Sequence, residues 1–152
     1  MSSPRIEEEV TRSEEETAAL AARYAASLEP GDLILVSGEI GAGKSTFVRA
    51  ALRELGVEGP IPSPTFTIGR SYRGRVPLHH LDLYRLEDAP EEEVPDLLGE
   101  YLDPAGITFV EWPRATWRQL LRTQGRVRPI EISLERDDAR RIRFGDPVKP
   151  RS

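Results

Sequence analysis

The sequence of 152 residues contains no cysteine, which excludes disulfide bonds, thiolate nucleophiles and zinc sites built on thiolates. It also lacks a long apolar run, because none approaches the roughly 20 residues that a membrane-spanning helix needs. The opening segment MSSPRIEEEV is acidic and has no apolar core of the kind that a signal peptide requires. We therefore expect a cytoplasmic protein without membrane contact, built as one domain with a sizeable core.

Lysine is nearly absent as well. Of the 21 basic residues only Lys44 and Lys149 are lysines, and the others are arginines. A lysine ammonium is a compact charge on a slim stem, whereas the arginine guanidinium is a broad fork. Lys44 ends a glycine-rich segment, and the use of lysine rather than arginine at this position indicates a site that needs one ammonium among backbone amides. The net charge of −5 argues against general binding of nucleic-acid phosphates.

That glycine-rich segment, GEIGAGKS at residues 38–45, matches the P-loop pattern G-x-x-x-x-G-K-[ST]. It stands between a predicted strand over 33–36 and a predicted helix over 45–56, which is the context that the motif requires. Glycines let successive N–H groups turn inward on an anion, and the helix adds its positive end. We expect Lys44 to reach the β- and γ-phosphates of a nucleotide and the Ser45 hydroxyl to bind Mg²⁺.

Asp82 and Glu111 are the candidates for the acidic group that a P-loop needs near its metal ion. Each follows apolar residues, in LHHLDLYR and ITFVEW, and is expected to project from the end of a strand. One is predicted to ligate the metal and the other to orient water or to ligate through water; the sequence does not order these roles. The adjacent His79 and His80 would face opposite sides of a strand, which favours structural or hydrogen-bonding roles over a shared metal site.

Helices and strands alternate along the chain and predict an α/β domain with a mixed sheet. A capping box at Ser13 and Glu16 begins a helix over 14–28, and residues 1–12 and 147–152 are expected to be flexible ends. The remaining predicted elements are an antiparallel hairpin of strands 66–72 and 76–84 joined at residues 73–75, helical segments over 87–102 and 114–123, and strands over 106–112, 128–135 and 140–146.

Four motifs, GEIGAGKST, SPTFT, HLDLYRL and VEW, follow one another in this order. Together they resemble the TsaE family, also called YjeE, the small bacterial ATPases of tRNA threonylcarbamoyladenosine synthesis. The resemblance covers nearly the whole chain. It implies a single P-loop NTPase domain of three layers, with a mixed central β-sheet flanked by helices. It also implies weak ATPase activity with ATP or ADP and Mg²⁺ as ligands.

The family's partners are the TsaB and TsaD proteins, which transfer the threonylcarbamoyl group to adenosine 37 of tRNAs that read ANN codons. The resemblance therefore implies that this chain acts on the TsaB–TsaD pair and meets tRNA only through that complex. The P-loop reads G-K-S-T where the family more often has G-K-T-T, a change that keeps the hydroxyl. Pro95 interrupts an acidic segment that is a smoother helix in other members. If this segment contacts the partners, the affinity for them is the property that the proline would change.

Site residues carry over from the family motifs by position, and Arg140, in ERDDARRI, lies where the family's nucleotide site can receive a contribution from late in the chain. The catalytic residues are expected to be Lys44, Asp82 and Glu111, and the metal ligands Ser45, Glu111 and Asp82. Contacts to the nucleotide are expected from Gly38, Glu39, Ile40, Gly41, Ala42, Gly43, Lys44, Ser45, Thr46, Ser63, Thr65, Trp112 and Arg140. Among these, Ser63 and Thr65 flank Pro64 in a loop after the P-loop helix, where P-loop proteins often carry a switch that senses the γ-phosphate; a rigid connector is the other interpretation.

Two other functions remain open on the sequence. A small-molecule kinase would need an acceptor pocket and an arginine-bearing lid, and the chain has little length left for them. A non-hydrolysing, ATP-dependent assembly factor differs from a weak ATPase by rate alone. A GTP-dependent switch is excluded, because the chain has no lysine between Lys44 and Lys149 that could complete an N-K-x-D guanine motif.

Overall fold

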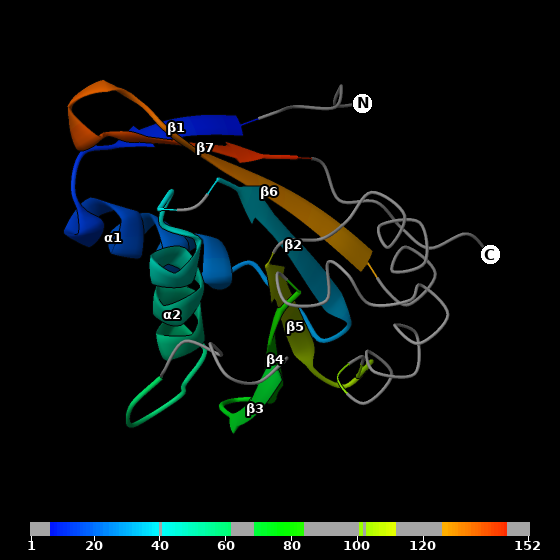
Figure 1. Ribbon diagram of the computed structural model, residues 1–152. Coiled ribbons are helices and arrows are strands. Elements are labelled where there is room, and N and C mark those ends of the chain that lie inside the picture. The colour runs from blue at the N-terminus through cyan, green and yellow to red at the C-terminus, as the bar shows by residue number, and fades with distance from the viewer. Residues whose placement is uncertain are drawn as a thin grey trace.

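The computed structural model describes residues 7–39, 41–61, 69–83, 101, 103–111 and 126–145. The elements in chain order are β1 (Glu7–Thr11), α1 (Glu14–Ala25), β2 (Asp32–Gly38), α2 (Lys44–Glu54), β3 (Gly69–Arg73), β4 (Pro77–Asp82), β5 (Ile107–Glu111), β6 (Arg126–Leu134), the short 3-10 helix η2 (Arg136–Asp138) and β7 (Arg140–Phe144). The strands form one seven-stranded sheet in the order β1-β7-β6-β2-β5-β4-β3 (Figure 1). The predicted α/β fold with a mixed central sheet is confirmed.

The central strands of the sheet run parallel. β2 pairs with β5 and β6, and β4 pairs with β5, all in parallel register. β3, β7 and β1 add antiparallel pairs toward the two edges, and the β3–β4 hairpin turns at Gly74 as predicted. Because the carboxyl ends of parallel strands lie at one edge of a sheet, the segments that follow β2, β4 and β5 emerge close together.

Helix α1 begins where its capping signal predicts. Ser13 is the N-cap, and its hydroxyl accepts a hydrogen bond from the Glu16 amide at 3.1 Å. The Glu16 carboxylate reaches back to the amide of Arg12 at 3.3 Å, so two N–H groups at the start of the helix are satisfied. The helix ends at Ala25, before the predicted limit at residue 28.

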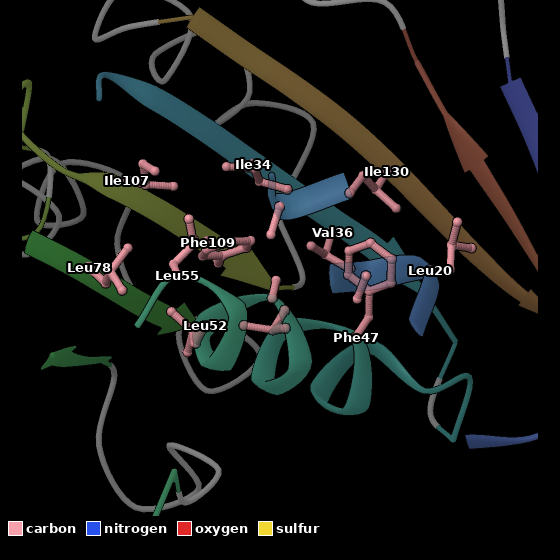
Figure 2. Packing of buried hydrophobic residues seen from close by; sticks show 14 of the residues in the cluster. Leu20, Ile34, Val36, Phe47, Leu52, Leu55, Leu78, Ile107, Phe109 and Ile130 are labelled. Atoms are coloured by element: carbon pink, nitrogen blue, oxygen red, sulfur yellow. The ribbon is translucent and has the colours of Figure 1, made fainter. Parts of the chain in front are cut away.

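The main core lies between the sheet and helices α1 and α2, which cover the same face of the sheet (Figure 1). Figure 2 shows Phe47 of α2 close to Leu20 of α1 and Val36 of β2. Phe47 is fully buried, and its ring centroid lies 5.8 Å from that of Tyr24 and 6.1 Å from that of Phe144. One aromatic ring thus joins both helices to the sheet.

The opposite face of the sheet is apolar too. Alternate residues of its central strands point away from α1 and α2 and are buried, among them Leu33, Leu35, Leu81 and Val110. Such strands, apolar on both sides, are typical of a parallel sheet inside a three-layer α/β domain. Within the described ranges, no helix has the length and apolar character that crossing a membrane requires.

The N-terminal segment differs from the prediction. Residues 1–12 were expected to form a flexible end, yet Glu7–Thr11 form β1, which pairs with β7 from Glu7 opposite Phe144 to Thr11 opposite Arg140. Its sequence EEEVT lacks the apolar alternation of a buried strand. Charge across the strands contributes instead, because Glu8 forms ion pairs with Arg141 and Arg143. The predicted helical segments 87–102, apart from Tyr101, and 114–123, and the end 147–152, lie outside the described residues.

We expect Phe47→Ala to lower the free energy of unfolding by about 3–5 kcal/mol, because the change removes a fully buried ring and leaves a cavity. Leu134→Ala is the control: Leu134 is the last residue of β6 and is 39% exposed, so we expect a loss below about 1 kcal/mol. Urea unfolding followed by circular dichroism measures both values. Equal losses in the two variants would contradict the described core.

Candidate functional site

The predicted P-loop connects β2 to α2, and its glycines shape it. Gly41 (φ 82°) and Gly43 (φ 99°) have left-handed backbone angles that other residues rarely adopt. Gly38 is needed for a different reason, since a Cβ atom there would lie 2.3 Å from the carbonyl oxygen of Ile132 in β6. The start of the loop therefore lies directly against the backbone of the neighbouring strand.

Lys44 is the first residue of α2, and its side chain folds back over the loop. Its Nζ donates hydrogen bonds to the carbonyl oxygens of Gly38 and Glu39, each at 2.8 Å. Burial lowers the pKa of the Lys44 ammonium below its ordinary value, although the carboxylates of Glu111 and Asp82 oppose this shift. The ammonium is thus held beside the positive end of α2, in an arrangement that suits a bound anion.

Two acidic side chains reach this place from the ends of neighbouring strands. Asp82 and Glu111 are the last residues of β4 and β5 and lie opposite each other in the parallel register. Glu111 is buried, and the Ser45 hydroxyl donates a hydrogen bond to its Oε1 at 3.3 Å. His80 Nε2 is hydrogen-bonded to the other carboxylate oxygen, Oε2. The structure therefore brings Ser45 together with the two acids.

Arg140 reaches the P-loop from the start of β7. The turn between β6 and β7 contains Asp137 and Asp138, both with left-handed backbone angles (φ 58° and 59°). This turn directs Arg140 toward the loop, where its guanidinium donates to the carbonyl oxygen of Asp138 at 2.7 Å and to that of Gly41 at 3.4 Å. The late arginine expected at the site thus lies against the P-loop.

These groups line one cavity with a volume of about 600 Å³. The predicted site residues in its lining are Gly41, Gly43, Lys44, Ser45, Thr46, Asp82, Glu111 and Arg140. The residues in its lining that sequence reasoning missed are Arg12, Ser13, Glu14, Thr17 and Asp138. Most of the missed residues belong to the junction of β1 and α1, where the sequence shows a helix cap and no other signal.

The other predicted contacts are placed differently. Gly38 and Glu39 meet the site through the carbonyl oxygens that hold Lys44. Ala42 is fully buried and belongs to the hydrophobic core rather than to the cavity lining. The remaining predicted residues lie outside the described part of the chain: Ile40, Ser63, Pro64, Thr65 and Trp112.

The chemistry of this donor set fits Mg²⁺. Ser45, Asp82 and Glu111 offer oxygen atoms, which are the ligands that this hard cation prefers. In the ranges that the structure describes, no group of three or more His, Cys, Asp or Glu side chains forms a metal cage. Mg²⁺ in nucleotide sites is usually held by one or two carboxylates together with phosphate oxygens, so the two acids beside a phosphate loop suffice.

Comparison with known proteins identifies the family to which this chain is similar. The model of the family described as "Threonylcarbamoyl adenosine biosynthesis protein TsaE" matches residues 11–142. A TsaE protein of Bacillus subtilis is 42% identical over 86% of this chain and 79% of its own length, and one of Aquifex aeolicus is 35% identical over 86% of both chains. The crystal structure of YdiB from B. subtilis matches with a TM-score of 0.75 and 32% identity, over 97% of this chain and 88% of that one.

Gly38→Ala and Gly41→Ala separate the two roles of glycine in the loop. We expect Gly41→Ala to lower the free energy of unfolding by about 1–2 kcal/mol, because the left-handed backbone is strained with a Cβ and the space around it is open. Gly38→Ala should cost about 1–3 kcal/mol more, since the new methyl group meets the Ile132 carbonyl. Urea unfolding of both variants tests this order, and a larger loss in Gly41→Ala would contradict it.

Proposed function

Because the chain belongs to the TsaE family of threonylcarbamoyladenosine biosynthesis, we propose that it binds ATP with Mg²⁺ and hydrolyses the nucleotide slowly in support of this tRNA modification. The observation that carries the proposal is the convergence of Lys44, Ser45, Asp82 and Glu111 on one cavity at the P-loop. A phosphate loop, an ammonium and two carboxylates together are the parts that P-loop ATPases use.

Each part has a distinct task in the proposed site. The backbone N–H groups of the loop and the N-terminus of α2 bind the phosphates, and Lys44 neutralises charge on the β- and γ-phosphates. Ser45 and Glu111 would hold Mg²⁺, which would supply stabilisation of the negative charge that develops as the γ-phosphoryl group passes to water and ADP departs. Asp82 lies beside Glu111 and orients water or completes the metal shell. Arg140 bounds the cavity on the side of the P-loop, where its guanidinium contacts the carbonyl oxygen of Gly41.

The same cavity is also lined by residues outside the P-loop and the two acids. These are Arg12, Ser13, Glu14 and Thr17 at the start of α1, together with Asp138 from the β6–β7 turn. The guanidinium of Arg12 and the carboxylates of Glu14 and Asp138 supply donors and acceptors for the edges of a base or the hydroxyls of a ribose. We therefore propose that the junction of β1 and α1 receives the nucleoside while the P-loop receives the phosphates.

The partners in the proposal are TsaB and TsaD, and the setting is the cytoplasm. This part rests on family membership, since the related proteins are named for threonylcarbamoyladenosine biosynthesis in tRNA. The negative net charge of the chain favours contact with a protein complex over direct binding of the tRNA backbone. In this proposal ATP hydrolysis resets or remodels the complex that carries out the transfer.

We expect Lys44→Ala to weaken binding of a fluorescent ATP analogue by about 10- to 100-fold, the equivalent of one hydrogen bond between charged groups, and to abolish Mg²⁺-dependent phosphate release. Arg49→Ala removes a positive charge from an exposed position on the same helix and should leave both properties unchanged. Fluorescence titration and a phosphate-release assay measure them. Unaltered binding in Lys44→Ala would overturn the proposed nucleotide site.

The partner proposal has its own measurement. We expect slow ATP hydrolysis by the purified protein that rises at least several-fold when TsaB and TsaD are added together, with Lys44→Ala as the blank. Nucleotide binding without hydrolysis, alone or with the pair, would instead indicate an assembly factor. Indifference to the pair combined with fast turnover on a small phosphoryl acceptor would indicate a kinase.

A further inference from the structure

We propose that His80 is a positioning residue that fixes the carboxylate of Glu111 in the orientation needed to hold the metal ion. His80 is fully buried, and Glu111 is 2% exposed. The imidazole Nε2 is hydrogen-bonded to Glu111 Oε2, while Oε1 is the oxygen nearer to the Ser45 hydroxyl, at 3.3 Å. The inference rests on the proposed Mg²⁺–nucleotide site and adds a residue that stands behind it.

The sheet register places His80 for this task. Asp82 lies opposite Glu111 and His80 lies opposite Phe109, so His80 precedes Asp82 by one repeat on the same face of β4. Phe109 and Glu111 likewise share a face of β5. The histidine therefore lies behind the acid as seen from the P-loop, on the side of the sheet that α2 covers. β4 and β5 thus supply one acid each, and β4 also supplies the histidine that is hydrogen-bonded to Glu111.

A role in packing alone does not account for a histidine at this position. Its second ring nitrogen, Nδ1, is buried without a hydrogen-bond partner among the described residues. A buried nitrogen without a hydrogen bond destabilises the folded state, so packing alone would favour an apolar side chain at this position. Glu111 supplies the reason for the polar ring, because a buried carboxylate needs a donor. Hydrogen bonds of this kind orient metal-ligating side chains.

His79 provides a matched control from the same dipeptide. It points to the opposite face of the sheet, where Nδ1 lies 2.8 Å from the Ser71 hydroxyl and Nε2 lies 3.4 Å from Asp103. Neither partner lines the cavity at the P-loop. A change at His79 alters a histidine of β4 while leaving Glu111 and its surroundings intact.

The experiment measures how binding of a fluorescent ADP analogue depends on Mg²⁺ in wild type, His80→Met, His80→Gln and His79→Gln. We expect His80→Met, which fills the space without a donor, to raise the half-saturating Mg²⁺ concentration by about 10- to 100-fold. His80→Gln should recover most of this loss, because its amide N–H reaches the position of Nε2. His79→Gln should match wild type, and nucleotide binding in EDTA should be equal in all four proteins.

Two further readouts complete the test. In a Glu111→Gln background, His80→Met should cause no additional loss of Mg²⁺ response, because the partner is already changed. The chain has two histidines, so NMR of the imidazole nitrogens shows two sets of signals. The set that is missing in His79→Gln belongs to His79, and the His80 signals are thereby assigned in a protein that keeps His80. We expect the His80 signals to shift when Mg²⁺ is added to the ADP complex and the His79 signals to stay in place.

The outcomes separate the two proposals. A wild-type protein whose nucleotide binding ignores Mg²⁺ would overturn the metal site and the inference with it. A Mg²⁺-dependent wild type with an unchanged Mg²⁺ response in His80→Met, or with an equal loss in His79→Gln, would overturn the role of His80 alone. Should His80→Met fail to fold, the wild-type NMR signals decide, and His80 signals that ignore Mg²⁺ would overturn the inference.

Discussion

The parallel pairing of β2, β5 and β4 is the constraint on which the site depends. Because these strands run in one direction, their carboxyl ends meet at one edge of the sheet. The P-loop leaves from the end of β2, and Glu111 and Asp82 stand at the ends of β5 and β4. An antiparallel neighbour would have carried its last residue to the far edge. The same hydrogen bonds that build the sheet thus set the distance between phosphate loop and acids.

Charge is balanced locally in this arrangement. Lys44 is buried, and burial alone disfavours its ammonium form. Two backbone carbonyls and two nearby carboxylates offset part of that loss of hydration, although the pKa of Lys44 stays lowered. The site therefore holds charges of both signs at short range. In the proposed nucleotide complex, the phosphates and their cation also carry charges of both signs.

Motifs made the phosphate loop and the two acids predictable from sequence, because both depend on residue type at the end of an apolar strand. The central strands, the β3–β4 hairpin and helices α1 and α2 were predictable for the same reason of local pattern. The remainder depended on contacts between distant segments. Arg12 and Thr17 reach the cavity because β1 pairs with β7, and the acidic segment that forms β1 resembles a solvated end. The bond between His80 and Glu111 likewise requires a register between strands that no local pattern reveals.

The pairing of β1 with β7 has a consequence for the order of the chain. Glu7 lies opposite Phe144, so the first and last strands of the sheet meet at one edge, as Figure 1 shows. The turn at Gly74 lies near the other edge, and none of its residues lines the cavity at the P-loop. A circular permutation that joins β7 to β1 through a linker and opens the chain at this turn would keep the segment from β2 to α2 uninterrupted. The order in which the chain connects these strands can therefore change while the residues of the site keep their places.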